Sequence, residues 1–585
     1  MIQVQNLAYS FPQKDLFSDV TFTIEDGKHC VLFGTNGTGK STLLQILRNP
    51  DDYMYEGKII CDFNDSIGYI SQSIPQFQEH ITVMQYLSET FVKHQEKLNS
   101  YYTLMETSDD LETVFEEYQQ VLDAWTAMDG DSYESNIQKQ LNITNLVKLA
   151  EQQLSRLSSG EFKLVQIIKE MLHPHKLLIM DEPDVFLDFE HLNSLRILLG
   201  SHKGTLLVIT HNRYLLNHCF DKILHMENQR VNEFNGSYLA YNYELLARKV
   251  ELAETAALEQ EEIKRQQEIV DKTRARATEM YSASLGKTVH ARQAIVDRLV
   301  ARKTEEPFID ITQPNIQFTV ANDVQNKTVL SLHNYSLAFD EQLLEQVNIE
   351  VCAGEHVAIV GRNGTGKTSL LMDLWKNDKD SIHILDEIEL GIFTQKNEHL
   401  LDQTVSILDL FEWETMDQKD QLTGYLSSYG FETETLSQTF AELSGGERDI
   451  LQLALLAYKK YDFLLLDEPT GHLDIYAQIA LEKAIQEYKG SILMISHDYY
   501  TVANCVDYVF LIEHGTIRRM SARKFRQMIY ASYFDKNYLL LEQEKKEKEN
   551  QILKHLQKKE FTKAKEVLSS LAQIIDKMNR SSVGS

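Results

Sequence analysis

One glycine-rich pattern, G-x-x-x-x-G-K-S/T, occurs twice in the 585-residue chain, near its start and again past its middle. Each copy follows an apolar run and precedes a run with helical spacing. In such a loop the glycines let backbone N–H groups approach phosphate oxygens, the lysine neutralises the β- and γ-phosphates, and the final hydroxyl ligates Mg²⁺. The repeat therefore predicts two nucleotide sites in one polypeptide. The predicted loop residues are Gly34, Asn36, Gly37, Gly39, Lys40, Ser41 and Thr42 in the first copy and Gly361, Asn363, Gly364, Gly366, Lys367, Thr368 and Ser369 in the second.

Length and charge limit the classes of protein that fit this repeat. A chain of 585 residues exceeds what one hydrophobic core organises, so two or more domains are expected. The formal net charge of -29 argues against a protein that coats nucleic acid indiscriminately, because counterion release needs a basic surface, although a local basic element stays open. Five scattered cysteines, mostly set among apolar neighbours, predict buried thiols in a reducing compartment. The lack of a signal core or of an apolar run near ~20 residues favours the cytoplasm.

Two later apolar runs end in Asp-Glu-Pro, one in each half of the chain. Such runs are typical of buried parallel strands, and a carboxylate pair at the end of a strand is well placed for catalysis. The aspartates, Asp181 and Asp467, are predicted to hold Mg²⁺ through its water shell. The glutamates, Glu182 and Glu468, are predicted to orient or deprotonate the water that attacks the γ-phosphate. The alternative is that these acids only end their strands as solvated residues.

A histidine follows another predicted strand at the same distance from the glutamate in both halves. His211 and His497 lie 29 residues after it (211 − 182 and 497 − 468). An equal offset favours a shared role, and we predict contact with the γ-phosphate, whereas a lone histidine after a strand is more often an ordinary surface or core residue. Gln72 and Gln395 follow short strand-like segments and are predicted to join the Mg²⁺ shell.

Two aromatic residues precede the lysines at nearly the same distance in both halves. Phe11 and Phe339 lie 29 and 28 residues before them (40 − 11 and 367 − 339). An aromatic face can stack on adenine, so both residues are predicted to bind the base. A core aromatic residue would give the same pattern.

A third repeated element carries a family resemblance. Leu-Ser-Gly-Gly-Glu occupies residues 443–447, and Leu-Ser-Ser-Gly-Glu occupies residues 157–161. With the motifs above, this element resembles the ATP-binding-cassette superfamily, whose signature loop lies at a helix N-terminus and offers N–H groups and the positive end of the helix dipole to a phosphate. The resemblance identifies as signature residues Ser158, Gly160, Ser444, Gly445 and Gly446.

The resemblance also implies how the two halves cooperate. In that superfamily the signature of one domain completes the nucleotide site of the other. Two ATP molecules would then be held between the halves of one monomeric chain, Lys40 facing Ser444 and Lys367 facing Ser158. ATP binding would close this sandwich and hydrolysis would open it.

The first half departs from the family pattern at two places. Ser159 replaces the first glycine of the signature, and Asp-Val-Phe-Leu-Asp at residues 184–188 stands where the second half has Thr-Gly-His-Leu-Asp at residues 470–474. The catalytic acids survive both changes. We therefore expect altered rates rather than an inactive site.

Two segments are not shared between the halves. The first half has a surplus at about residues 88–142 with helical spacing of apolar residues, which indicates either a projecting helical arm or a larger helical subdomain. Between the halves, residues 239–304 lack proline and are rich in Glu, Gln, Ala, Arg and Lys, which is typical of long solvated helices. A turn at residues 281–286 would make this linker an antiparallel hairpin.

The linker changes the sign of the charge. Residues 272–303 contain eight bases and two acids in an otherwise acidic chain. A basic tip on an acidic protein indicates a polyanionic partner, and the predicted contact residues are Arg274, Arg276, Lys287 and Arg292. A simple spacer or coiled coil is the alternative.

The whole arrangement resembles the F subfamily of ATP-binding-cassette proteins, in which tandem ATPase domains carry an arm in the first domain and a helical linker between the domains. Residues 234–241, Phe-Asn-Gly-Ser-Tyr-Leu-Ala-Tyr, are similar to the subfamily's end-of-domain motif. Members bind the ribosomal E site, and the linker reaches towards P-site tRNA and the peptidyl-transferase centre. Some are translation factors and others displace ribosome-targeting antibiotics; the divergent first half slightly favours antibiotic protection over a housekeeping role. The ATPase subunit of a transporter is disfavoured, because such subunits lack a long basic linker.

We therefore expect an α/β fold with two nucleotide-binding domains, a helical-hairpin linker and a helical C-terminal extension. The expected boundaries are residues 1–238 for the first domain, 239–306 for the linker, 307–525 for the second domain and 526–585 for the extension. The extension is rich in Lys and Glu, and is either a hairpin that contacts ribosomal RNA or a solvated tail.

Overall fold

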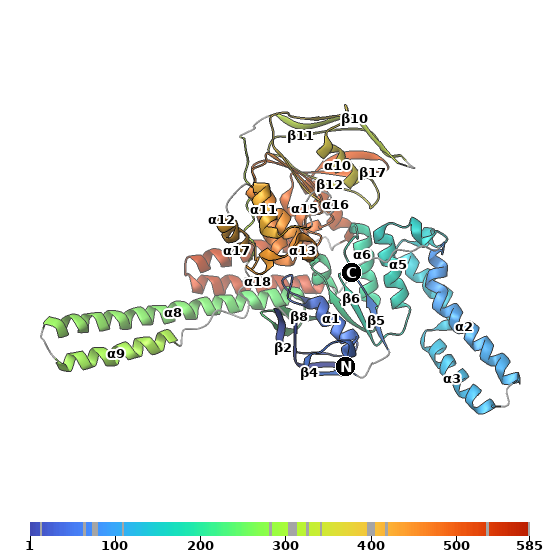
Figure 1. Cartoon of the computed structure of the whole chain (residues 1–585), viewed down its shortest axis with the longest axis horizontal. Coiled ribbons are helices and arrows are strands. Elements are labelled where there is room, and N and C mark those ends of the chain that lie inside the picture. The colour runs from blue at the N-terminus through green and yellow to red at the C-terminus, as the bar shows by residue number, and fades with distance from the viewer. Residues whose placement is uncertain are drawn as a thin grey trace. The chain divides into compact units, whose positions relative to one another are not determined.

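The computed structural model describes residues 1–11, 14–61, 66–72, 80–107, 110–279, 283–301, 313–322, 327–339, 342–394, 404–415, 419–533 and 538–582. The chain forms two compact units, which are described separately. The first contains Met1–Asn235 and Thr312–Ile529, and the second contains Gly236–Ile311 and Tyr530–Ser585. Figure 1 shows the helices and strands along the chain.

Parallel strands form the centre of the first half of the first unit. They are short apolar runs with both faces covered, as expected for parallel strands that lie between helices. Their order in the sheet is β5-β6-β7-β3-β8, and antiparallel β9 continues it. The bounds are β3 His29–Phe33, β5 Ile67–Ile70, β6 Leu177–Asp181, β7 Thr205–Ile209, β8 Lys222–Glu227 and β9 Arg230–Asn235.

The same sheet extends beyond β9 into an antiparallel layer. Strand β2 meets β9 at Asp19 and Arg230, and β1 and β4 follow in antiparallel register. Apolar side chains from this layer, including Val4 and Leu7, pack in one core with Leu32 and Ile179 of the central strands. The bounds are β1 Ile2–Phe11, β2 Lys14–Ile24 and β4 Glu56–Cys61.

The second half repeats this topology. Its central sheet has the order β14-β15-β16-β12-β17-β18, which matches β5-β6-β7-β3-β8-β9 strand for strand, while β11-β10-β13 form a separate antiparallel sheet. The sequence repeat is therefore a repeat of fold, and the predicted α/β class with two such domains is confirmed. The bounds are β10 Thr328–Ala338, β11 Gln342–Cys352, β12 His356–Val360, β13 Ile382–Ile384, β14 Leu390–Phe393, β15 Phe463–Asp467, β16 Ser491–Ile495, β17 Tyr508–Glu513 and β18 Thr516–Ser521.

Matched helices follow the matched strands. The phosphate loops lead into α1 and α10, the signature loops into α5 and α13, and the strands that end in the acids and histidines lead into two further pairs. The bounds are α1 Lys40–Arg48, α5 Ser159–Met171, α6 Phe189–Ser201 and α7 Arg213–His218 in the first half, and α10 Lys367–Lys376, α13 Gly445–Tyr458, α14 Ile475–Glu487, α15 Tyr499–Cys505 and α16 Ala522–Tyr533 in the second.

The surplus of the first half consists of three helices. They are α2 Val83–Thr107, α3 Leu111–Ala127 and α4 Tyr133–Ile143, whereas the described residues of the second half form the short helices α11 Ile407–Thr415 and α12 Lys419–Ser427 at this point. Phe91, Trp125 and Met128 form a small buried cluster. Leu111 and Phe115 are exposed, and α2 and α3 run outward as a hairpin (Figure 1).

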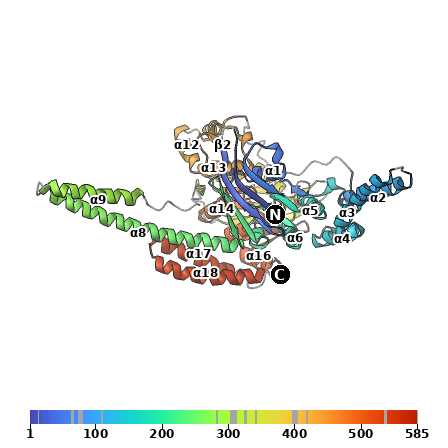
Figure 2. The same ribbon diagram turned by 90° about the horizontal axis from the view of Figure 1, so that it is seen from below.

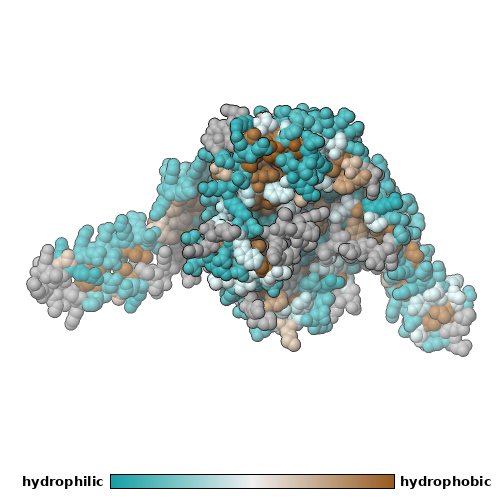
Figure 3. All heavy atoms as spheres, turned by 45° about the horizontal axis from the view of Figure 1, so that its top comes forward, coloured by the Kyte–Doolittle hydropathy of each residue, from teal (hydrophilic) through white to brown (hydrophobic). Residues whose placement is uncertain are grey.

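The linker in the second unit is a hairpin of α8 Tyr238–Glu279 and α9 Ala283–Ala301. The 42 residues of α8 give a length of about 63 Å at 1.5 Å per residue. Val270, Val289 and Val296 are buried between the two helices, and on the face shown in Figure 3 the coloured residues of the hairpin are mainly hydrophilic. The turn predicted for residues 281–286 is too long, because α9 already includes residues 283–286; residues 280–282 lie outside the described residues.

The C-terminal extension packs against the linker. Helices α17 Tyr538–Gln557 and α18 Phe561–Ser582 form a hairpin that lies along α8 (Figure 2). Ser237 Oγ donates to Asn579 Oδ1 at 3.0 Å, and Lys565 forms an ion pair with Glu254 of α8. Buried side chains of α18 include Leu571 and Met578. Residues 538–582 are thus a packed helical pair rather than a solvated tail.

Two properties expected from composition can be compared with the structure. Cys30, Cys219 and Cys505 are buried, but Cys61 is half-buried and Cys352 is exposed, so the expectation of buried thiols holds for three of the five. Within the described part of the chain, no helix has both the length and the apolar character needed to span a bilayer.

Candidate functional site

The two phosphate loops fold in the same way. Lys40 Nζ donates to the carbonyl oxygens of Gly34 and Thr35 at 3.0 and 2.8 Å, and Lys367 Nζ makes the equivalent bonds in the second loop at 2.9 and 2.8 Å. Both lysines are buried, which lowers their pKa, and nearby carboxylates oppose this effect. The lysine closes each loop into a ring, so that the loop N–H groups can converge on an anion.

A glycine ends each loop where the backbone requires one. Gly39 and Gly366 have φ of +92° and +86°, the left-handed region that residues with a Cβ rarely adopt, and each is the N-cap of the following helix. The helix begins at the lysine itself. Its free N–H groups and the positive end of its dipole therefore point at the centre of the loop.

A hydroxyl and an aspartate meet at the end of each loop. Thr368 Oγ1 donates to Asp467 Oδ1 at 3.2 Å, and the Ser41 hydroxyl bonds to Asp181, whose pKa burial raises. Oxygen donors of this kind are what Mg²⁺ takes in proteins, so both pairs fit a Mg²⁺ ion. Gln72 follows β5 beside this site, whereas Gln395 lies outside the described residues.

The glutamates that follow these aspartates have an unusual backbone. Glu182 and Glu468 have φ of +47° and +49°, although neither is glycine, and both donate their N–H to the strand next door, to Ile209 and Ile495. Such strain persists only where the surroundings hold the residue, and it occurs often at catalytic positions. Burial is the main cause that raises the pKa to about 8 for Glu182 and to about 7 for Glu468. Each carboxylate can therefore exchange a proton near neutral pH.

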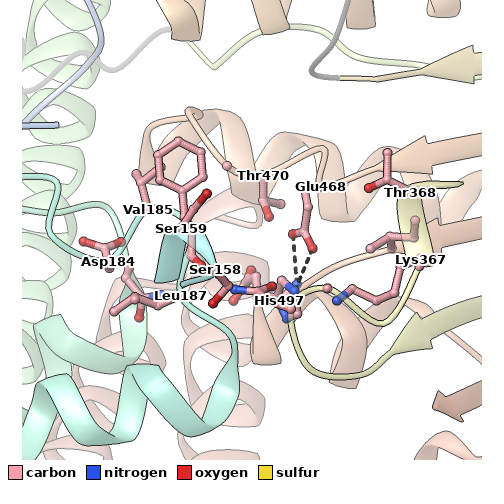
Figure 4. Close-up of a pocket in the computed structure, with 18 of the residues that line it drawn as sticks. Ser158, Ser159, Asp184, Val185, Leu187, Lys367, Thr368, Glu468, Thr470 and His497 are labelled. Atoms are coloured by element: carbon pink, nitrogen blue, oxygen red, sulfur yellow. Dashed lines mark hydrogen bonds and ion pairs between the residues drawn. The ribbon is translucent and has the colours of Figure 1, made fainter. Parts of the chain in front are cut away.

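The groups that contact the glutamates differ between the halves. Gln72 Nε2 donates to Glu182 Oε2 at 2.6 Å. In the second half the backbone N–H of His497 donates to Glu468 Oε2 at 3.0 Å, and His497 Nε2 lies 3.4 Å from Glu468 Oε1 (Figure 4).

The two histidines are buried and neutral. Burial lowers the pKa of His211 well below its ordinary value and lowers that of His497 to about 3. Among the described residues, neither ring nitrogen of His211 and not the Nδ1 of His497 has a hydrogen-bond partner. A buried polar atom without a partner is rare in a folded protein, and here it suits a phosphate oxygen.

The signature loops begin their helices with capping boxes. The hydroxyl of Ser158 accepts from Glu161 N at 3.3 Å and that of Ser444 from Glu447 N at 3.4 Å, while each glutamate accepts from the N–H of its serine. Both loops therefore present the N-terminus of a helix, as an anion site requires. Ser159 is the first residue of α5 and lines the same cavity as Lys367.

Each signature glycine lies against the phosphate loop of the other half. A Cβ on Gly446 would come within 1.9 Å of Asn36 Nδ2, and one on Gly160 would come within 3.0 Å of Asn363 Nδ2 and 2.7 Å of the Phe186 carbonyl. Only glycine leaves room for these approaches. The signature glycine of each half thus lies close to the phosphate loop of the other half.

The same asparagines join the halves by reciprocal hydrogen bonds. Asn36 N donates to Asp474 Oδ2 at 3.0 Å, and Asn363 N donates to Asp188 Oδ2 at 3.2 Å. Their side-chain amides donate to the carbonyls two residues before those aspartates, at 2.9 and 2.7 Å. Sequence reasoning named Asp188 and Asp474 only as parts of a repeated motif; their equal position in it was the signal for this role.

The site that contains Lys367 is a cavity of about 640 Å³ between the halves. Ser158 and Asp184 line it from the first half, and Lys367, Thr368 and Glu468 line it from the second, as Figure 4 shows. Phe339 also lines this cavity, as its predicted contact with the adenine base requires. Phe11 is half exposed and its ring packs edge-on against Tyr9.

Buried charges distinguish the first half from the second. Thr210 Oγ1 donates to Asp184 Oδ1 at 2.6 Å, and burial raises the pKa of Asp184 to about 6. Lys163 of α5 is completely buried nearby, and burial lowers its pKa to about 8 while Asp184 opposes that shift. The equivalent position, five residues after the signature serine, is Asp449 in the second half. Sequence reasoning missed Lys163, although comparing the two signature helices would have exposed this contrast.

A buried arginine also joins the histidine loops of the two halves. Arg213 follows His211 by two residues, and its Nη2 contacts Asp498 Oδ2 at 2.8 Å and Glu482. The repeat did not predict this contact, because the second half has Tyr499 at the equivalent position.

The predicted basic contacts lie in the linker of the second unit. Arg274 and Arg276 on α8 are exposed, and Arg274 Nη2 donates to Gln293 Oε1 of α9 at 3.3 Å. Arg292 on α9 is half-buried, and the side chain of Lys287 lies outside the described residues.

Known proteins resemble the chain over most of its length. A family model described as ABC transporter matches residues 17–185 and 344–471, and a second model with that description matches residues 224–318. The uncharacterized ABC transporter ATP-binding protein YfmM of Bacillus subtilis (strain 168) is 28% identical, over 86% of this chain and 96% of that protein. ABC transporter F family member 2 of Arabidopsis thaliana is 28% identical, over 88% of this chain and 76% of that protein.

Solved structures share the fold at lower identity. The archaeal ribosome recycling factor aABCE1, in its complex with the ribosomal stalk protein aP1, superposes with a TM-score of 0.52 and 17% identity over 90% of this chain and 92% of that one. RNase-L Inhibitor superposes with the same TM-score and identity over 91% and 92%. A chain in a model of ribosome-bound archaeal Pelota and ABCE1 superposes with a TM-score of 0.52 and 15% identity, over 91% of this chain and 82% of that one.

Proposed function

The chain belongs to the ATP-binding-cassette family and, within it, to the F subfamily, and on that premise we propose that its ATPase cycle acts on the ribosome. The observation that carries the ATPase part is the reciprocal contact between halves, in which Asn36 and Asn363 bond to Asp474 and Asp188. This contact brings each signature loop to the opposite phosphate loop. ATP would then be the ligand that holds the halves of one monomer together, and hydrolysis would release them.

The side chains take matching roles at the two sites. The lysines, Lys40 and Lys367, and the loop N–H groups bind the β- and γ-phosphates, while the opposite signature contacts the γ-phosphate through its helix N-terminus. The buried neutral histidines donate to a γ-phosphate oxygen from an otherwise unpaired ring nitrogen. The carboxylates of Glu182 and Glu468 accept the proton of the attacking water, for which a pKa near neutrality is suited.

Mg²⁺ would be held by Ser41 and Asp181 in the first half and by Thr368 and Asp467 in the second. When bound, it neutralises charge on the β- and γ-phosphates. Gln72 is a further ligand candidate on the first site. Its amide already contacts Glu182, so it can link the occupation of the site to the position of the base.

Two observations support a ribosomal partner. The solved structures with the same fold include a ribosome recycling factor and a ribosome-bound protein. The linker hairpin also carries exposed basic residues in a protein whose net charge is -29, and RNA phosphate is a polyanion that such a surface binds. We propose that Arg274, Arg276, Lys287 and Arg292 contact ribosomal RNA or tRNA, and that the protein works in the cytoplasm.

Ribosome binding can be tested by sedimentation. The double variant Glu182→Gln/Glu468→Gln should retain ATP, stay closed and pellet with ribosomes through a sucrose cushion, while the wild-type protein pellets less because it hydrolyses ATP and dissociates. A Lys40→Ala/Lys367→Ala variant, which cannot bind phosphate, is the matched control and should remain in the supernatant. Equal recovery of all three proteins with ribosomes would contradict the proposal.

The finer function that we propose is protection of the ribosome from antibiotics. The changed signature residue Ser159 and the divergent segment of residues 184–188 alter one half only. Such an asymmetry suits an ATPase cycle whose rate sets how long the protein stays on the ribosome. Expression in a sensitive host should raise the inhibitory concentration of at least one antibiotic that targets the large ribosomal subunit. No change with any such antibiotic, together with slower growth of a strain that lacks the protein, would instead indicate a housekeeping translation factor. We retain as proposed boundaries residues 1–238, 239–306, 307–525 and 526–585.

A further inference from the structure

We propose that Lys163 is a positioning residue for the ATP site that contains Lys40. Its buried ammonium holds the backbone at Gln72, and Gln72 in turn fixes the carboxylate of Glu182. The inference rests on the proposed role of Glu182 as the base, and it assigns to the first half a device that the second half lacks.

The contacts form a continuous chain. Lys163 Nζ donates to the carbonyl oxygen of Ser71 in a short hydrogen bond and lies 3.3 Å from that of Gln72. Gln72 Nε2 then donates to Glu182 Oε2 at 2.6 Å. Glu182 has the left-handed φ of +47°, a strained backbone conformation that persists only where the surrounding groups hold it.

The burial of Lys163 indicates that its hydrogen bonds restrict the positions of Ser71 and Gln72. The residue is 0% exposed, and a buried ammonium is stable only with hydrogen-bond acceptors and opposite charges around it. Two backbone carbonyls supply the acceptors, and Asp181, Glu182 and Asp184 supply the charge. Moving Ser71 and Gln72 away would remove both acceptors of the buried ammonium at once, so the Lys163 bonds oppose that movement.

The second half has a different charge arrangement. Asp449 replaces Lys163 at the same place in the signature helix, and Thr470 replaces Asp184. At these two positions the first half therefore has both a carboxylate, Asp184, and an ammonium, Lys163, that the second half replaces. Lys163 compensates the divergent Asp184, which explains how this half accepts an acid beside its catalytic carboxylates without loss of the fold.

The contact also relates the two ATP sites. Helix α5 begins directly after Ser158, which serves the site of Lys367, and Lys163 lies in the second turn of that same helix. A shift of α5 when its signature meets a nucleotide would move the Gln72 segment through the Lys163 bonds. Glu182 would then be positioned for the site of Lys40 by events at the other site.

The test separates the two sites with single glutamine variants. Lys163→Met, which keeps the length of the side chain, is introduced into Glu468→Gln, where the Lys40 site supplies the hydrolysis, and into Glu182→Gln, where the Lys367 site supplies it. We expect kcat to fall about tenfold to a hundredfold in the first background with little change in KM, and by less than twofold in the second. An equal loss in both backgrounds, or no loss in either, would overturn the proposal.

Two controls keep the test independent of folding and of the base assignment. Lys169→Met changes the same residue type in the same helix, where Lys169 pairs with Glu89 at 2.8 Å, and should leave both backgrounds unchanged. Lys163→Arg keeps the charge and donors and should recover most of the lost kcat; a loss as large as that of Lys163→Met would contradict the proposal.

Amide hydrogen exchange measures the positioning directly in the full chain. Lys163→Met should speed exchange in the peptide that contains Ser71 and Gln72 by tenfold or more, with helix α13 as an internal reference. Unchanged exchange there would overturn the proposal even if activity fell. If Glu182→Gln alone leaves all hydrolysis intact, the assignment of the base fails, and the exchange result still decides whether Lys163 holds the segment.

Discussion

Arg213 of the first half and Asp498 of the second form a buried ion pair of 2.8 Å between the loops that carry His211 and His497. Asp498 directly follows His497, and Arg213 lies two residues after His211. The side chains are only 13% and 14% exposed, and Arg213 also pairs with the buried Glu482, so loss of the arginine leaves two carboxylates with little access to solvent. The pair fixes one histidine loop against the other.

Removing one partner of this pair should be costly. We expect Arg213→Gln to destabilise the nucleotide-free protein by about 3 kcal/mol, since the carboxylates of Asp498 and Glu482 are left buried without their cation. The double variant Arg213→Gln/Asp498→Asn should lose clearly less than the sum of the single variants in thermal unfolding. Lys483→Gln, on the exposed face of α14, is the control and should change stability by less than about 0.5 kcal/mol. Strict additivity would show that the pair contributes nothing.

Replacing Glu182 and Glu468, the two proposed catalytic bases, should separate ATP binding from hydrolysis. Glu182→Gln/Glu468→Gln keeps the shape of both side chains but cannot accept a proton, so we expect ATP binding to persist while kcat falls by at least about 100-fold. A binding assay with labelled ATP and a phosphate-release assay measure the two effects. Near-normal turnover in the double variant would contradict the assignment of these carboxylates.

The two ATP sites should be unequal. The site that contains Lys367 faces Ser159, where the other site faces Gly445, and an added side chain changes how closely backbone and phosphate approach. Glu182→Gln and Glu468→Gln should therefore leave different residual rates, and Ser159→Gly should change only the rate that remains in Glu182→Gln. Identical residual rates, with Ser159→Gly silent, would disprove the inequality.

Asp449 should make stability depend on pH. It is 4% exposed, and burial raises its pKa from an ordinary value near 4 to about 7, so the folded state favours the protonated carboxyl. The stability that this proton provides is complete below the unfolded pKa and is lost as the pH rises towards 7. The increase in the free energy of unfolding caused by Asp449→Asn should therefore be about 2 kcal/mol larger at pH 7 than at pH 5, measured by thermal unfolding. A gain that does not depend on pH would rule out this explanation.

The basic linker should govern ribosome binding rather than ATP chemistry. Changing Arg274, Arg276, Lys287 and Arg292 to serine removes four charges. The negative slope of log affinity against log salt concentration should therefore become less steep, by up to about 3. ATPase activity without ribosomes should remain within twofold. Serine at four exposed lysines outside the linker is the matched control. Ribosome binding that is as tight as in the parent across the salt titration would reduce the linker to a spacer.

The sequence by itself determined the local chemistry of the sites. Each phosphate loop, each Asp-Glu pair and each signature depends on residues that are neighbours along the chain, so their types and spacing predicted both the motifs and the strands and helices that carry them. The repeat then predicted the tandem fold, and the lack of proline predicted the long linker helices. For Phe339 the sequence could not separate a base-binding aromatic residue from a core one, but the residue lines the cavity that contains Lys367.

Only the tertiary structure decided which distant residues meet. Lys163 and Ser71 are 92 residues apart and Arg213 and Asp498 are 285 apart, and no periodicity in the chain relates them. Such contacts depend on how helices pack on the sheets and on how the halves face each other, which is a balance of burial, charge and shape over the whole unit. The packing of α17 and α18 on α8 is of the same kind: the sequence predicted helices, and the burial of their apolar faces decided where they lie.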